Sequence, residues 1–246
     1  MSSQETIVVA FDLYGTLLST ASIAEELAKH FGKEKAQEVA TLWRRYQLEY
    51  TWRLNSMNIY EPFFEVTRKS LGQSLAESDL ELDEEFVESL MKAYDSLSTF
   101  PDVLPALESV STHTNITAVV FSNGTDEMVG NSVRQSPDLS PHASKFSQLV
   151  TVGQVKKFKP HADVYFHLAK TMGKGTSKEE MGKLWLVSGN PFDVVGARSV
   201  GMQAAWVDRG GNGWTDRMIQ GDAGAPTFIG KDLKEIVNSI ASYTGQ

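Results

Sequence analysis

Polar side chains that could carry chemistry follow four apolar runs of the sequence, where each run ends or shortly beyond it. They are Asp12 after residues 7–11, Ser122 and Asn123 after 116–121, Lys159 beyond 149–152, and Ser188, Asn190 and Asp193 after 184–187. Brought together, they would supply two carboxylates, an ammonium and several hydroxyl and amide groups. These group types suit a polar catalytic or binding site.

Each of these residues, judged alone, also has an ordinary structural explanation. Asp12 could cap a helix or form a turn, and Asp193 could sit in the first turn of a helix, where negative charge is favoured. Ser122-Asn123-Gly124 is a common turn sequence, and most lysines, such as Lys159, are on the surface. Their recurrence at four successive strand ends favours function, because ligands of open parallel sheets bind outside the carboxyl ends of the strands.

Short apolar runs predict the strands that would position these groups. The run 7–11 is apolar throughout, which is typical of a strand buried on both faces. Further strands are predicted at 116–121, 149–152, 184–187, 204–207 and 227–229, with helices at 126–133, 162–172, 192–200 and from 232 onward. Alternating strands and helices indicate an α/β fold with a doubly wound, Rossmann-like parallel sheet, whose right-handed crossovers bring the strand ends to one edge.

Residues 19–98 have a different pattern, with helical periodicity and no convincing strand. One apolar helix face is formed by Val39, Leu42, Trp43, Tyr46 and Tyr50, and further helices are predicted around 63–71 and 86–93. The sequence therefore predicts two domains. They are an α/β core formed by 1–18 and 99–246 and an inserted helical cap formed by 19–98.

Composition and charge exclude several classes of protein. The formal net charge of −8 over 246 residues argues against a nucleic-acid binder, which needs Lys and Arg. The absence of cysteine excludes a thiol nucleophile and Cys-ligated metal, and the five histidines show no metal-ligand spacing. We see no leader sequence and no run of about 18 apolar residues, which predicts a cytoplasmic protein that does not bind membranes.

Four segments in this order resemble the motifs of the haloacid dehalogenase superfamily. They are Phe11-Asp12-Leu13-Tyr14-Gly15-Thr16-Leu17, Phe121-Ser122-Asn123-Gly124, Lys159-Pro160 with Tyr165, and Ser188-Gly189-Asn190-Pro191-Phe192-Asp193. The chain is most similar to the (S)-2-haloacid dehalogenase (type II) branch, over nearly its whole length. Within the predicted cap, residues 42–44 and 47–52 resemble that branch's cap helix.

This resemblance implies hydrolytic dehalogenation of small (S)-2-haloalkanoic acids to (R)-2-hydroxy acids. Asp12 would attack the halogen-bearing carbon and form an ester, which water then hydrolyses. The implied catalytic residues are Asp12, Thr16, Arg44, Lys159, Ser188, Asn190 and Asp193. Those implied to bind substrate are Tyr14, Leu48, Phe63, Ser122, Asn123, Tyr165 and Phe192. Arg44 would accept the departing halide, and the neighbouring Arg45 stands where the family more often has Gln.

The role of Lys159 follows from its charge, and the other individual roles are implied by the resemblance. An ammonium at Lys159 would keep Asp12 ionised, since an adjacent opposite charge favours the carboxylate. By resemblance, Asp193 with Ser188 and Asn190 positions the water, and Ser122 and Asn123 bind the substrate carboxylate. Phe192 and Gly189 stand where many relatives have Trp and Ser.

Two alternatives remain open at this stage. Phosphatases of the superfamily carry a second Asp, a general acid, at the position of Tyr14, and they use Mg²⁺. A halide leaving group needs no proton, so Tyr14 favours dehalogenation, and Asn190 leaves few acidic ligands; we predict no metal and no cofactor. The second alternative is a non-catalytic carboxylate binder, against which the cost of unused buried charge argues. Resemblance also implies a homodimer.

Overall fold

The computed structural model describes residues 6–243 and contains one parallel six-stranded sheet. The strand order is β3-β2-β1-β4-β5-β6, so β1 lies centrally between β2 and β4. The strands are β1 (Ile7–Phe11), β2 (Ile116–Ser122), β3 (Gln148–Thr151), β4 (Leu184–Ser188), β5 (Gln203–Val207) and β6 (Phe228–Gly230). All six predicted strands are present, and the predicted α/β class is confirmed.

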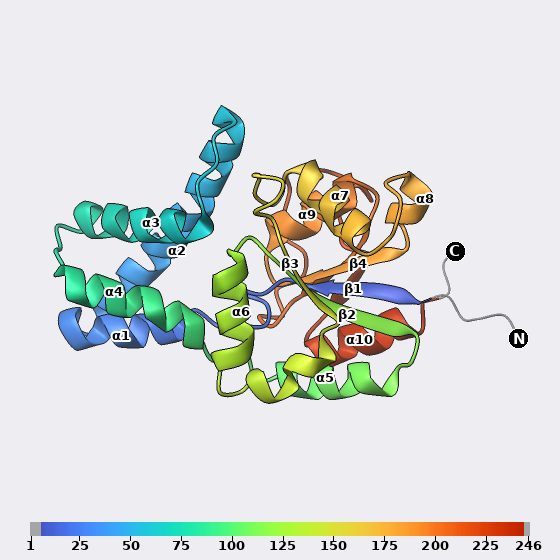
Figure 1. Cartoon of the computed structure of the whole chain (residues 1–246), viewed down its shortest axis with the longest axis horizontal. Helices are drawn as coiled ribbons and strands as arrows, with labels where there is room; N and C mark the ends of the chain where they lie inside the picture. Colours follow the sequence, from blue (N-terminus) through green and yellow to red (C-terminus); the bar gives the residue numbers. More distant parts are fainter. Residues whose placement is uncertain (1–5, 244–246) are drawn as a thin grey trace, which may run out of the picture.

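Helices cover both faces of the sheet, as a doubly wound fold requires (Figure 1). On one side lie α7 (Ala162–Thr171), α8 (Lys178–Met181) and α9 (Pro191–Ser199), and on the other α5 (Val103–Thr112), α6 (Asp126–Gln135) and α10 (Leu233–Ala241). The short 3-10 helix η2 (Ser140–Lys145) precedes β3. Helix α5 was missed from the sequence, although its buried Val103, Ala106, Leu107 and Val110 have helical spacing.

The helical insertion stands beside the sheet, beyond the edge where the strands end (Figure 1). It comprises α1 (Ala21–Phe31), α2 (Lys33–Met57), α3 (Phe63–Glu77), α4 (Glu84–Ala93) and the 3-10 helix η1 (Tyr94–Ser96). The chain enters and leaves it through two paired segments: Leu18 bridges Thr99, and the Ser19 N–H donates to the Ser98 carbonyl at 2.8 Å. This pairing holds the base of the insertion close to the end of β1.

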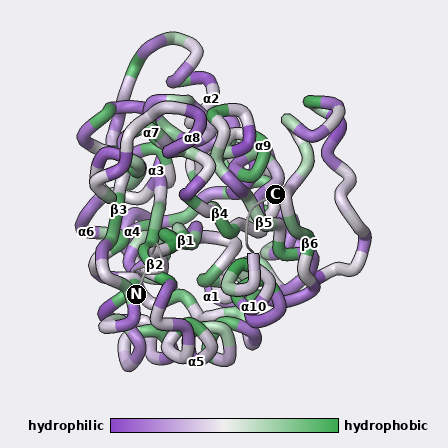
Figure 2. Tube along the Cα trace, turned by 90° about the vertical axis from the view of Figure 1, so that its right-hand side faces the viewer, coloured by the Kyte–Doolittle hydropathy of each residue, from purple (hydrophilic) through white to green (hydrophobic). Residues whose placement is uncertain are grey.

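The hydrophobic core is centred on β1, β2 and β4. Every residue of β4 is buried, and so are the last four residues of β1. Figure 2 shows the hydrophobic colour concentrated in these strands, while the loops are mostly hydrophilic. Full burial of an aliphatic or aromatic side chain contributes about 1.5–3 kcal/mol, so this core holds the carboxyl ends of the strands in fixed positions.

Candidate active site

Asp12 follows β1 directly, and its two carboxylate oxygens have different surroundings. Oδ2 accepts three hydrogen bonds, from Thr16 Oγ1 at 2.8 Å, Asn190 Nδ2 at 2.7 Å and Ser188 Oγ at 3.3 Å. Oδ1 has one partner, the Lys159 ammonium at 3.1 Å. These contacts are to side chains and not to the start of a helix, so Asp12 is not a helix cap. Oδ1 is the oxygen with lone pairs left for a substrate.

Lys159 is fully buried, which excludes the surface interpretation of this residue. Its Nζ lies 3.1 Å from Asp12 Oδ1 and 2.8 Å from Asp193 Oδ2, and it also donates to the Phe121 carbonyl at 2.8 Å. Burial alone would lower the pKa of Lys159, but the two carboxylates outweigh it and raise that pKa. The side chain therefore stays an ammonium and connects the two acids.

Asp193 lies in the first turn of α9 and is fully buried. Burial raises the pKa of its carboxyl to about 6; the Asp12 charge adds to this, while Lys159 and the Tyr165 hydroxyl oppose it. Tyr165 donates to Asp193 Oδ1 at 2.7 Å, and its ring packs edge-on against Phe121. We predicted Tyr165 as a substrate contact, but the contact that the structure gives its hydroxyl is with Asp193.

Asn190 connects the motifs at the ends of β1 and β4. Its Nδ2 donates both to Asp12 Oδ2 at 2.7 Å and to the Tyr14 carbonyl at 3.0 Å. The turn of Gly15 makes this approach possible, because Gly15 has a φ of +84°, and a Cβ there would lie 3.3 Å from Asn190 Nδ2. The Gly189 N–H donates to Thr16 Oγ1 at 2.9 Å, which fixes the hydroxyl that binds Asp12.

Ser122 and Asn123 lie at the end of β2, beside the same edge. Ser122 Oγ accepts from the Gly124 N–H at 3.1 Å, as the turn interpretation expects, and its hydroxyl proton can serve a ligand. The Lys159 N–H donates to Asn123 Oδ1 at 2.9 Å, so the amide nitrogen of Asn123 is its remaining donor. Two donors that could bind a carboxylate therefore follow one another at the end of β2.

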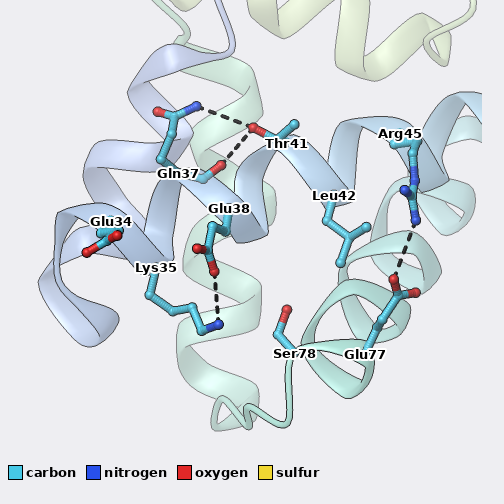
Figure 3. Close-up of a pocket in the computed structure, with 9 residues that line it drawn as sticks. All are labelled: Glu34, Lys35, Gln37, Glu38, Thr41, Leu42, Arg45, Glu77 and Ser78. Atoms are coloured by element: carbon cyan, nitrogen blue, oxygen red, sulfur yellow. Dashed lines mark hydrogen bonds and ion pairs between the residues drawn. The ribbon is translucent and has the colours of Figure 1, made fainter.

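Arg44 comes from α2 and reaches across to the core. Its Nη2 lies 3.3 Å from the Tyr14 carbonyl and 3.5 Å from Asn190 Oδ1, and its Nη1 donates to Gln47 Oε1 at 2.5 Å. Arg45 instead faces the outer surface of the helical insertion, where it pairs with Glu77 at 3.5 Å (Figure 3). None of the residues around Asp12 lines that outer hollow, so Arg45 lies outside the site.

The predicted apolar residues lie between the insertion and the core. Phe63 stacks on the Tyr14 ring with 6.2 Å between centroids, and Tyr14 is held further by its hydroxyl, 3.2 Å from Ser132 Oγ. Phe192 meets Trp52 of α2 edge-on at 5.5 Å. Leu48 is half-buried on α2.

Arg209 is a site neighbour that the sequence analysis missed. It follows β5, donates to the Thr16 carbonyl at 2.8 Å and pairs with Asp102 at 3.0 Å. The rule used for the other strand ends, applied to β5, would have found it. Arg209 thereby ties the Asp12 loop to the segment that returns from the helical insertion.

The arrangement does not resemble a metal centre. Within residues 6–243 no group of three or more His, Cys, Asp or Glu side chains is placed to hold an ion. Between Asp12 Oδ2 and the Tyr14 carbonyl lies the Asn190 amide nitrogen, which donates to both oxygens. An amide N–H₂ cannot ligate a cation, so these residues do not fit Mg²⁺.

Comparisons with known proteins agree with the motifs. The family model of haloacid dehalogenase-like hydrolases matches residues 8–201. The chain is 32% identical to haloacetate dehalogenase H-2 of Moraxella sp. (strain B), over 95% of this chain and 97% of that protein. It is 33% identical to an (S)-2-haloacid dehalogenase of Pseudomonas fluorescens, over 94% of this chain and 95% of that protein.

Solved structures show the same likeness in three dimensions. One is the L-2-haloacid dehalogenase from Xanthobacter autotrophicus with chloropropionic acid covalently bound. It superposes with a TM-score of 0.81 at 26% sequence identity, covering 97% of this chain and 100% of that one. The likeness therefore spans both the parallel sheet and the helical insertion.

Proposed function

Because the chain belongs to the haloacid dehalogenase-like hydrolase family, we propose that it hydrolyses small (S)-2-haloacids to (R)-2-hydroxy acids through an ester on Asp12. The asymmetry of the Asp12 carboxylate carries the proposal. Oδ2 is held by three donors, while Oδ1 meets only Lys159. One oxygen is fixed and the other is free to attack.

In the first step, Oδ1 attacks the halogen-bearing carbon on the side opposite the halogen. The new bond joins Oδ1 to that carbon, and the carbon–halogen bond breaks with its electron pair leaving as halide. Arg44, half-buried above the Asp12 loop, receives the anion. A guanidinium suits this role, because it is always charged and less strongly hydrated than an ammonium. The amide of Asn123 and the hydroxyl of Ser122 hold the substrate carboxylate.

In the second step, water adds to the carboxyl carbon of Asp12. The three donors on Oδ2 stabilise the developing oxyanion, which is how such donors accelerate acyl transfer. Asp193, whose pKa burial raises to about 6, takes one water proton and returns it to the departing hydroxyl oxygen. Asp12 then releases the second water proton to solvent, so one proton accompanies each halide. The substrate carbon is untouched, and its configuration is inverted once.

A phosphatase reaction fits the site less well. It needs a general acid for the alkoxide leaving group. Burial raises the pKa of the Tyr14 phenol, and its hydroxyl is engaged by Ser132. The position two residues after the nucleophile therefore offers no acid, and the Asn190 amide replaces a metal ligand. We propose a metal-independent reaction.

We also propose that 19–98 is the cap domain and that 1–18 with 99–246 is the core. We expect the cap to close over a substrate bound to the core, with hinges in the paired segments near Leu18–Ser22 and Ser96–Asp102.

No helix within residues 6–243 is long and apolar enough to cross a membrane. The prediction of a cytoplasmic location rests on the N-terminal sequence, of which residues 1–5 lie outside the described range. A homodimer stays a proposal that rests on the sequence resemblance.

The test is halide release from enantiopure 2-chloropropionate by the wild-type protein and by Asp12→Asn. The amide is a very poor nucleophile, so the variant should fold and be inactive. In a single turnover in ¹⁸O-water the product should carry unlabelled oxygen from Asp12. Comparable rates for both enantiomers, or solvent label in that first product, would rule out the mechanism.

A further inference from the structure

Gln47 is a fully buried polar side chain on α2 that the reaction described above does not use. Its Oε1 accepts from Arg44 Nη1 at 2.5 Å, and its Nε2 donates to Thr67 Oγ1 of α3 at 2.7 Å. A second contact of Nε2, at 3.5 Å, is with the Tyr94 hydroxyl. Gln47 therefore connects Arg44 to two other elements of the helical insertion.

The orientation of the Gln47 carboxamide is fixed from both ends. Arg44 can only donate, so the atom that faces it must be the amide oxygen. On the other side, the Thr67 hydroxyl gives its proton to the Phe63 carbonyl at 2.8 Å and is left to accept, so it must face the amide nitrogen. A reversed amide would lose both bonds inside a buried site, which is costly.

Thr67, which holds Gln47, is itself held in place by hydrogen bonds to α2 and within α3. The Trp43 indole donates to the Thr67 carbonyl at 2.8 Å, which registers α2 against α3. Thr67 also shares a helical turn with Phe63, the ring that stacks on Tyr14. One edge of the Arg44 guanidinium is thus held by the helical insertion, while Nη2 reaches the Tyr14 carbonyl of the core.

We propose that Gln47 is a positioning residue that aims the Arg44 guanidinium at the departing halide. This inference rests on the proposed dehalogenation. With Gln47 in place, the Arg44 guanidinium is held in one orientation before the reaction. The side chain then needs little reorganisation as negative charge develops on the halide. Without it, Arg44 can swing on its flexible stem. The effect falls on the first chemical step and most strongly on halides that leave poorly.

The experiment compares Gln47→Leu with Gln37→Leu, using 2-chloropropionate and 2-bromopropionate. Both changes replace a glutamine of α2 by leucine, but Gln37 is exposed on the outer face (Figure 3). Losing a hydrogen bond to a charged group should lower kcat for the chloro acid by about 10- to 100-fold. The loss for the bromo acid should be smaller, because bromide needs less stabilisation. Gln37→Leu should leave both rates unchanged.

Two further variants separate positioning from folding. Arg44→Lys should raise the bromo-to-chloro rate ratio in the same direction, and adding Gln47→Leu to it should change the ratio little, because the two residues act as a unit. Thr67→Val removes the acceptor of Nε2, together with the bond that this hydroxyl donates to the Phe63 carbonyl, and should give a weaker version of the same change. It serves as the test if Gln47→Leu does not fold, as judged by circular dichroism.

The outcomes distinguish this inference from the proposed function. If the wild-type protein releases no halide, the proposed function is wrong and this inference falls with it. If the wild type is active and Gln47→Leu lowers both rates equally, or changes neither, Gln47 does not position Arg44 while the dehalogenase assignment stands.

Discussion

The hydrogen bond between Tyr165 and Asp193 offers a quantitative test of the second step. Tyr165→Phe removes the hydroxyl that donates to Asp193 Oδ1 at 2.7 Å and leaves the ring beside Phe121. Both residues are fully buried, so water cannot readily replace the lost donor. Because the bond is stronger to the carboxylate than to the protonated acid, its loss favours protonation and raises the pKa of Asp193.

The size of the shift follows from the difference between two hydrogen bonds. A bond to a charged group contributes about 1.5–3 kcal/mol and one between neutral groups about 1 kcal/mol. The difference, about 0.5–2 kcal/mol, corresponds to about one pKa unit. Starting from about 6, the pKa of Asp193 should therefore rise toward about 7.

The assay is kcat for formation of the 2-hydroxy acid between pH 4.5 and 9, which includes the second step and reports ionisations of the enzyme with substrate bound. Activity requires ionised Asp193 and should fall as the pH drops through its pKa. Relative to wild type, the variant should lose about tenfold at pH 5 and almost nothing at pH 8. Tyr14→Phe is the matched control, because that hydroxyl contacts Ser132 and not Asp193. An acid limb that stays in place or moves to lower pH in Tyr165→Phe would refute the assignment of Asp193 as the base.

Three further predictions concern the cation, the metal and the assembly. Arg44→Lys should lower kcat by about 100-fold, because an ammonium cannot span Gln47 and the Tyr14 carbonyl together, whereas Arg45→Gln should be nearly silent; equal losses would show that the wrong arginine has been assigned. Activity should survive EDTA, and a steep loss restored by Mg²⁺ would return the protein to the phosphatase class. Sedimentation should show a dimer, and a mass near 27.2 kDa at micromolar concentration would contradict it.

Much of the fold could be predicted from local patterns. The apolar runs at 7–11 and 184–187 became the buried central strands β1 and β4, since a strand covered on both faces must be apolar throughout. The predicted strands differ from the observed ones by one residue at most at either end. Helix α5 was not predicted, although its buried residues have helical spacing. Helix α1 was predicted only as part of the helical region 19–98 and not as a separate helix.

The sequence by itself determined which chemical groups reach the site, because parallel crossovers place the residues after β1, β2 and β4 at one edge. Only the tertiary structure decided how those groups pair. It shows that Asp12 Oδ1 is the less occupied oxygen, that Tyr165 donates to Asp193, and that Gln47 holds Arg44. Hydrophobic periodicity shows which face of a helix or strand is buried, but it does not show which residues that face contacts. Partners from distant segments are set by the packing of whole elements, as Asp12 and Asn190 show, 178 residues apart in the chain.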